Sequence, residues 1–157
     1  MHSDYRRNVR VKAPVQLVWD EMNDLHSILS KSVQFLSYEL AADGKSARFS
    51  ANVTWGPLKY ALAGNAQIDT LTPRELTRYI VRVPQLDLRY GGALKITPGS
   101  ETETMLDYSG DLDIDHRLAG RMRGLFNELI EEHIHGLTTR VKTRAEQRRL
   151  ADERLLS

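Results

Sequence analysis

The residue of this sequence best suited to chemistry is His133, which lies in a stretch with the period of an amphipathic helix. Its side chain points into the apolar stripe of that helix, whereas His135 points about 160° away from it, toward solvent. An imidazole at a half-buried position could bond a ligand carbonyl or act as a general base near pH 7. Three roles stay open: a core histidine satisfied by a tyrosine or a backbone carbonyl, a ligand contact, or the catalytic residue of an enzyme.

Tyrosines are the second group of candidates, because several fall on the inward positions of alternating strand patterns. A buried phenol needs a hydrogen-bond partner, so inward tyrosines would give an apolar cavity polar handles. The alternative is a place at the rim, with the hydroxyl in solvent. Trp55, at a hairpin end, either gates the cavity or only packs. The residues predicted to bind a ligand are Trp55, Tyr60, Tyr79, Tyr90 and Tyr108 from the strands, and Met122, Phe126, Leu129, His133 and Leu137 from the helix.

Metal and cofactor chemistry finds no support in the motifs. Asp111, Asp113 and Asp115 superficially resemble a calcium loop, but His116 stands where the loop needs glycine and Met122 where it needs glutamate. Alternation places the three carboxylates on the outer, polar face of a strand. The sequence lacks cysteine, a phosphate-binding glycine loop, a nucleotide fingerprint, a nucleophile elbow and a zincin motif. We therefore expect no metal and no cofactor.

The bulk composition predicts one soluble domain. The chain has 157 residues, of which 41% are apolar and 27% charged, and a formal net charge of +1. That charge gives no reason to expect a nucleic-acid partner. No apolar run is long enough for a signal peptide or a membrane span. We therefore expect a cytoplasmic protein.

The order of elements predicts the fold class. A strand over Tyr5–Lys12 precedes two short helices, one after Pro14 and one from Asp24 to Lys31. Six strand patterns with short connections follow between Val33 and Ile114, which indicates an antiparallel meander. A long helix then runs from about residue 116 to beyond Arg144. The prediction is an α+β helix-grip fold, a curved seven-stranded antiparallel sheet wrapped around the long C-terminal helix.

Three glycines sharpen this prediction. Gly64, Gly92 and Gly110 all fall on the apolar face of their strands, where glycine marks a bend, a bulge or a close approach. They favour a strongly curved sheet. Since a straight helix cannot touch such a sheet along its whole length, we expect a cavity between the two.

The end of the long helix is basic. From Arg140 onward six cations stand against three carboxylates. Cations favour a helix C-terminus, so a solvated helix end explains the pattern. The alternative is attraction of Arg140, Arg144, Arg148 and Arg149 to an anionic membrane face or a protein partner. We divide the chain into a helix-grip domain over 1–145 and a basic helical extension over 146–157.

The stretch from Val11 through Ala13-Pro14 to Val18-Trp19 resembles the first strand and helix of the START-like superfamily, which includes polyketide cyclases and birch-pollen-allergen-like proteins (SRPBCC). The resemblance covers about residues 5–145. Residues 51–60 with Gly64, and the helix from Met122 to Leu137, are more specifically similar to the carbon monoxide dehydrogenase G branch of this superfamily. Asn23-Asp24-Leu25-His26 replaces an Asp-Pro turn frequent in relatives, so we expect a different pocket entrance.

The resemblance implies binding or carriage of a hydrophobic small molecule such as a lipid, an isoprenoid quinone or a polyketide-like compound. Proteins of the carbon monoxide dehydrogenase G branch associate with membranes, which implies a cytoplasmic protein that can be peripheral to the membrane. The branch carries no shared catalytic constellation. One alternative is a cyclase or dehydrase that uses tyrosines and His133 for proton transfer; another is a protein-interaction module without a ligand.

Overall fold

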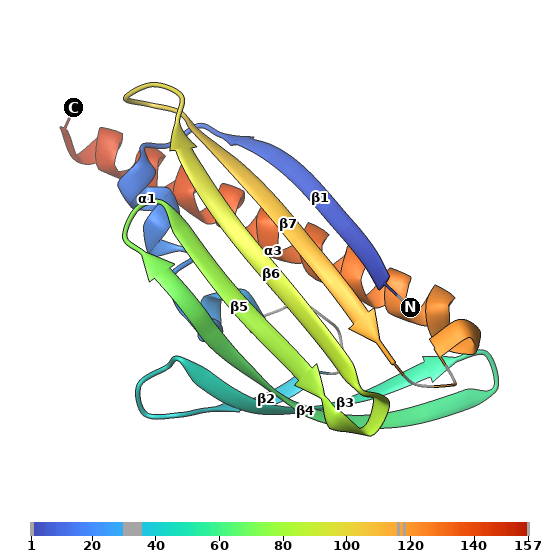
Figure 1. The fold of residues 1–157 in the computed structure, drawn as a ribbon. Coiled ribbons are helices and arrows are strands. Elements are labelled where there is room, and N and C mark those ends of the chain that lie inside the picture. The colour runs from blue at the N-terminus through green and yellow to red at the C-terminus, as the bar shows by residue number, and fades with distance from the viewer. Residues whose placement is uncertain (1, 30–35, 116, 118, 157) are drawn as a thin grey trace.

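The computed structural model describes residues 2–29, 36–115, 117 and 119–156. Figure 1 shows one sheet with a long helix lying across one of its faces. The strands are β1 (His2–Val11), β2 (Leu36–Leu40), β3 (Ser46–Trp55), β4 (Leu58–Thr72), β5 (Leu76–Val83), β6 (Leu88–Pro98) and β7 (Thr104–Ile114). The helices are α1 (Val15–Asp20), α2 (Leu25–Leu29) and α3 (Ala119–Leu156), with a 3-10 turn at Pro84–Leu86.

The seven strands form one antiparallel sheet in the order β1-β7-β6-β5-β4-β3-β2. Consecutive strands from β2 to β7 are neighbours. Strand β1 forms the other edge of the sheet and pairs with β7 from His2↔Asp113 to Val11↔Thr104. The predicted meander and the helix-grip fold are confirmed. Of the predicted segments, residues 30–31, 33–35, 116 and 118 lie outside the described residues.

Local sequence explains how the short helices begin. Pro14 precedes α1 with φ of −68°, an angle that its ring fixes and that suits a helix start. The Asp24 carboxylate accepts a hydrogen bond of 2.7 Å from the Ser27 amide, so it caps α2 as predicted. Helix α1 lies beside the C-terminal half of α3 (Figure 1), whereas α2 contacts α3 nearer its middle, where Arg140 donates to the Ser27 carbonyl.

The inward glycines mark close approaches. A Cβ on Gly92 would lie 2.3 Å from Cζ of Tyr79, its cross-strand partner, and one on Gly110 would lie 2.3 Å from the Tyr90 hydroxyl. The tyrosine rings therefore lie over bare backbone of the neighbouring strands. Gly64 does the same for Phe49, whose ring carbon Cζ would stand 2.8 Å from the added atom. Any larger residue would push these rings away from the sheet.

The core lies between the concave face of the sheet and α3. Strand β7 alternates buried and partly exposed residues along almost its whole length, as a strand with one covered face should. The predicted helix stripe is confirmed, because its described members turn toward the sheet. Those that are buried are Met122, Leu125, Phe126, Ile130, Leu137 and Val141, and they are joined by Ile134 and Ala145.

Helix α3 continues past the core. Ala145 is its last buried residue, whereas Leu150, Leu155 and Leu156 are 53%, 84% and 89% exposed. Figure 1 shows this end projecting beyond the sheet. Among the described helices, none combines the length and the apolar character that crossing a membrane requires.

Candidate functional site

A cavity of about 140 Å³ lies between the sheet and α3, on the side of strands β3 and β4. Almost no polar surface faces it. The described residues that line it are Leu29 from α2; Phe49, Ala51, Leu62, Val81, Val83, Leu88, Tyr90 and Leu112 from inward positions of the sheet; and Phe126, Leu129, Ile130 and His133 from α3.

The arrangement of β4 explains why the space is there. Residues 58–67 of β4 pair with β3, whereas β5 pairs with β4 only from Asn65 onward. The first half of β4 therefore leaves the β5–β7 part of the sheet and runs with β3 at an angle to it (Figure 1). The straight helix cannot follow both parts, so the interface opens where they diverge.

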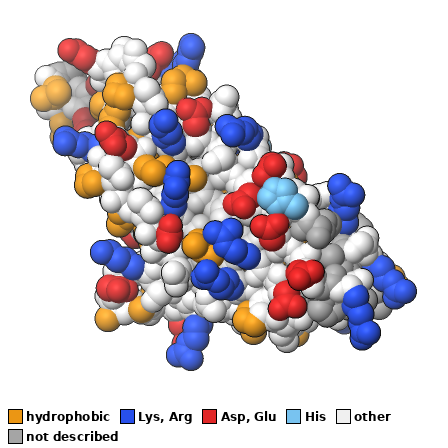
Figure 2. Space-filling model, viewed as in Figure 1, with side chains coloured by type: hydrophobic (Ala, Val, Ile, Leu, Met, Phe, Trp, Pro, Cys, Tyr) orange, Lys and Arg blue, Asp and Glu red, His pale blue; other side chains and the backbone are white. Residues whose placement is uncertain are grey.

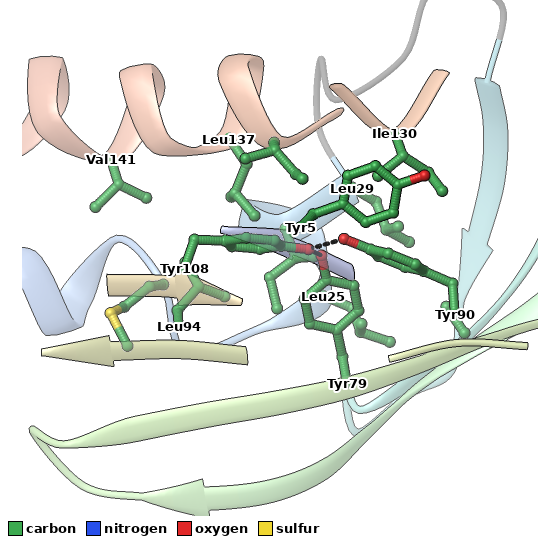
Figure 3. Packing of buried hydrophobic residues seen from close by; sticks show 14 of the residues in the cluster. Tyr5, Leu25, Leu29, Tyr79, Tyr90, Leu94, Tyr108, Ile130, Leu137 and Val141 are labelled. Carbon is green, nitrogen blue, oxygen red and sulfur yellow. Dashed lines mark hydrogen bonds between the residues drawn. The ribbon is translucent and has the colours of Figure 1, made fainter. Parts of the chain in front are cut away.

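A chain of hydrogen bonds between side chains lies beside this cavity. The Tyr79 hydroxyl bonds Nε2 of His133, and it lies 2.7 Å from the Tyr108 hydroxyl, which in turn bonds the Tyr90 hydroxyl. Figure 3 shows the three tyrosines converging between the sheet and α3. The His133 ring meets the tyrosine rings edge-on, with centroids 5.8 to 6.4 Å apart. We call these four residues the core tyrosine–histidine cluster.

The hydroxyl protons of the cluster can all be accepted within it. If Nε2 of His133 accepts the Tyr79 proton, the Tyr79 oxygen accepts from Tyr108, and the Tyr108 oxygen accepts from Tyr90. Every hydroxyl then donates once, in one direction along the chain. Because unpaired buried polar groups are costly, this arrangement holds the four side chains in place.

Burial also keeps the cluster uncharged. His133 is 8% exposed, and loss of hydration lowers the pKa of its imidazole to about 4. The same loss raises the pKa of Tyr79, Tyr90 and Tyr108 above that of a free phenol. At neutral pH the imidazole is therefore neutral and the phenols are protonated. This geometry corresponds to the core histidine satisfied by a tyrosine, one of the three roles left open by the sequence.

The predicted ligand residues divide into two main groups. Tyr90, Phe126, Leu129 and His133 line the cavity. The others described are buried in the core outside that lining, namely Tyr79, Tyr108, Met122 and Leu137, except for Tyr60, which packs half-buried against the core. The side chain of Trp55 lies outside the described residues, so its gating role stays a prediction.

Most of the cavity wall was not singled out from the sequence. Phe49, Ala51 and Leu62 from β3 and β4, with Val81 and Leu112 further along the sheet, are apolar residues on inward positions. The alternation that identified the inward tyrosines also contained these positions. The candidates predicted from the strands all carry a polar group, whereas the wall is built from aliphatic and aromatic carbon.

The four arginines proposed to contact a partner make contacts within the protein. Arg144 lies 3.2 Å from the Glu21 carboxylate and Arg148 lies 3.2 Å from that of Asp20. Arg149 donates to the Lys12 carbonyl at 3.0 Å, and Arg140 donates to the Ser27 carbonyl. These contacts attach α3 to α1, α2 and the end of β1. A membrane or protein partner for them stays a prediction.

Comparison with known proteins identifies the fold. No protein-family model and no curated protein sequence matches the chain. Among solved structures, a conserved protein from Geobacillus kaustophilus has 19% identity and a TM-score of 0.66, over 88% of this chain and 95% of its own. The Zhui aromatase/cyclase from Streptomyces sp. R1128 has 16% identity and a TM-score of 0.65, over 94% and 96%. Norcoclaurine synthase from Thalictrum flavum has 11% identity and a TM-score of 0.59, over 90% and 87%.

These solved structures confirm the helix-grip fold, which the resemblance of residues 11–19 to START-like proteins implied. At such identities the likeness establishes the fold alone. The carbon monoxide dehydrogenase G branch is not confirmed by them.

Proposed function

We propose that this chain, which has the helix-grip fold of START-like proteins, binds a small apolar molecule in the cavity between β3–β7 and α3. The observation that carries the proposal is the cavity wall, which is almost entirely apolar. An apolar cavity excludes water, because a water molecule there would lack its hydrogen-bond partners. Transfer of an apolar ligand into it is therefore favoured by both hydration and dispersion.

The volume narrows the class of ligand. Apolar protein cavities of about 150 Å³ stay dry and admit a molecule the size of benzene, and this cavity measures about 140 Å³. It suits one aromatic ring or a short branched hydrocarbon. A whole lipid, a quinone with its isoprenoid tail or a polyketide exceeds this volume. We therefore propose a single ring, or the ring end of a larger ligand.

Binding accounts for the polar groups better than catalysis does. A cyclase or dehydrase needs an acid or base that reaches the ligand, whereas His133 and Tyr90 bond within the core tyrosine–histidine cluster. The enzyme alternative draws support from the aromatase/cyclase among the structural relatives and from the presence of both residues in the cavity wall. It requires the cluster to break when a ligand enters.

Filling the cavity tests the proposal. Ala51 lies in its wall, so Ala51→Leu should occupy space that a ligand needs. Ala61, exposed on the neighbouring strand β4, provides the matched control Ala61→Leu. We expect benzene, added to the ¹⁵N-labelled protein, to shift amide signals around the cavity in the wild type and in Ala61→Leu. Ala51→Leu should weaken this binding at least tenfold.

Two outcomes would contradict the proposal: no saturable benzene shifts in the wild type, or equal affinity in Ala51→Leu. The enzyme alternative is distinguished by ring signals of His133. If a phenolic ligand such as 4-methylphenol bonds the imidazole, the signals of His133 should move much further than they do with benzene. Equal movement with both probes would argue for binding without polar recognition.

A further inference from the structure

A second histidine cluster lies on the outer face of the sheet, where β1 pairs with β7. Nδ1 of His2 lies 2.7 Å from Oδ1 of Asp113, and Nε2 lies 3.2 Å from Oδ1 of Asp4. One ligand atom each from His2, Asp111 and Asp113 lie within 4.8 Å of one another. Figure 2 shows a histidine surrounded by acidic side chains on this face.

The register of the two strands creates this group, which we call the outer histidine–aspartate cluster. In the antiparallel ladder His2 stands opposite Asp113 and Asp4 stands opposite Asp111. Residues two apart on a strand project from the same face. The four side chains therefore occupy the corners of one rectangle on a hydrogen-bonded platform.

The charges of the cluster are unbalanced. Three carboxylates surround one imidazole, and like charges directly opposite each other, such as Asp4 and Asp111, destabilise a strand pair. Arg89 is the cation that pairs with the cluster among the described residues, at 3.7 Å from Asp111. Even with a protonated imidazole, three carboxylates stand against His2 and Arg89, so the cluster keeps an excess of negative charge, which a divalent cation would neutralise.

The imidazole is already oriented as a metal ligand. In protein zinc sites, a ligating histidine typically donates its other ring N–H to a carboxylate, which fixes the tautomer and the ring position. Here Nε2 faces the Asp4 carboxylate while Nδ1 faces Asp113. Asp4 thus stands in the positioning role, and Nδ1 is directed at the carboxylates of the other strand.

The sheet also leaves room around the carboxylates. A Cβ on Gly91 would lie 2.8 Å from Oδ1 of Asp111, so the absence of a side chain at 91 lets this carboxylate lie low over the sheet. A hollow of about 480 Å³ on the outer face begins at Asp4 and Asp111 and extends over Gly91 and Ser109. His2 and Asp113 do not line this hollow, but their side chains are each 53% exposed. A cation at the cluster would therefore be reached from solvent, and with three protein ligands it would keep an open coordination position.

We propose that the outer histidine–aspartate cluster binds a divalent cation of the zinc type through His2 Nδ1, Asp111 and Asp113. Imidazole with carboxylates suits Zn²⁺, whereas Ca²⁺ and Mg²⁺ prefer oxygen ligands alone. Tetrahedral ligands at zinc distances stand about 3.4 Å apart. Side-chain rotations that move the ligand atoms by about an ångström would therefore close the site. The cation would tie the edge strand β1 to β7.

Zinc titration followed by calorimetry tests this site. We expect the wild type to bind one equivalent of Zn²⁺ with a Kd in the micromolar range. His2→Ala and Asp113→Asn should each weaken binding at least tenfold, and Asp4→Ala about tenfold through loss of the oriented imidazole. Asp107→Asn is the matched control, because Asp107 lies on the outer face of the same strand opposite Asn8, away from the cluster.

A stability measurement provides a second readout. With zinc at one hundred times its Kd, the thermal midpoint of the wild type should rise by about 5–10 °C, and His2→Ala should lose this rise while keeping the same circular dichroism spectrum. Three results would each overturn the proposal: a Kd above about 1 mM, unchanged affinity in His2→Ala, or equal weakening by Asp107→Asn and Asp113→Asn. The benzene experiment is independent of all three.

Discussion

His2 and His133 present the same side chain in opposite environments. The outer imidazole is exposed and bonds carboxylates, and the hydrogen bond to Asp113 is the main cause of its raised pKa. The inner imidazole is buried against phenols, and burial lowers its pKa to about 4. The hydrogen-bond partner and the exposure to solvent therefore determine the charge that each histidine favours. The outer imidazole favours the protonated form, and the inner imidazole favours the neutral form.

The largest predicted effect that tests this comparison is the dependence of the unfolding free energy on pH. The folded-state pKa of His133, about 4, lies below the unfolded value of 6.5. Between these values the unfolded chain binds a proton that the folded protein excludes, so the contribution of His133 is complete above pH 6.5 and declines as the pH falls. By pH 4 about 3 kcal/mol should be lost.

Urea unfolding of the wild type and His133→Gln between pH 7.5 and 4 measures this contribution. Glutamine can still bond Tyr79 but does not titrate. The difference in unfolding free energy between the two proteins should therefore shrink or change sign toward pH 4. A difference that stays constant across this range would show that His133 is not held neutral by burial.

Removal of a hydroxyl from the core tyrosine–histidine cluster should have the next largest effect. Tyr108 lies at its centre, so Tyr108→Phe leaves the Tyr79 and Tyr90 hydroxyls each without one partner. We expect a loss of about 2 kcal/mol, since buried unpaired polar groups retain their desolvation cost.

The exposed tyrosine–histidine pair supplies the control for this loss. The Tyr38 hydroxyl lies 2.8 Å from Nδ1 of His26 at the surface, where water can replace either partner. Tyr38→Phe should therefore change stability by less than about 0.5 kcal/mol. Equal losses in chemical denaturation would mean that burial does not set the value of these bonds.

The smallest expected effect is a shift in the titration of His2. The Asp113 carboxylate raises the pKa of this imidazole, so its stabilising contribution is present below the unfolded pKa and is lost as the pH rises through the folded one. In metal-free buffer, the ring proton signals of His2 should titrate above 6.5, and those of His133 near 4. Asp113→Asn should move the first midpoint toward 6.5 and leave the second unchanged; no movement would remove Asp113 as the cause.

Several features followed from sequence pattern alone, because they depend on local periodicity. Alternation through Leu106, Tyr108 and Leu112 predicted the buried face of β7, and the helical stripe through Phe126 and Leu137 predicted the face of α3 that meets the sheet. The glycines on the inward positions predicted a bend, a bulge or a close approach, and the structure shows close approaches at Gly64, Gly92 and Gly110. A fold with one helix and one sheet then left a single arrangement that buries both apolar faces.

The site residues were harder to predict. The inward direction of His133 and of the tyrosines was read from their spacing, but spacing does not say which hydroxyl meets which ring. The structure pairs Tyr79 with His133 and Tyr108 with Tyr90, so the hydroxyls expected to serve as polar handles bond one another and the imidazole instead. The cavity wall is left to residues such as Leu62 and Leu112, which looked like ordinary core.

The sequence by itself determined the strands, the helix, their apolar faces and hence the helix-grip fold, because each depends on residues a few positions apart. Only the tertiary structure decided the contacts between distant residues. It placed His133 in hydrogen-bond contact with Tyr79, His2 beside Asp113, and Arg148 against Asp20. The physical reason is that the charge and hydrogen bonding of a side chain depend on its neighbours in space, and strand register and helix placement choose those neighbours.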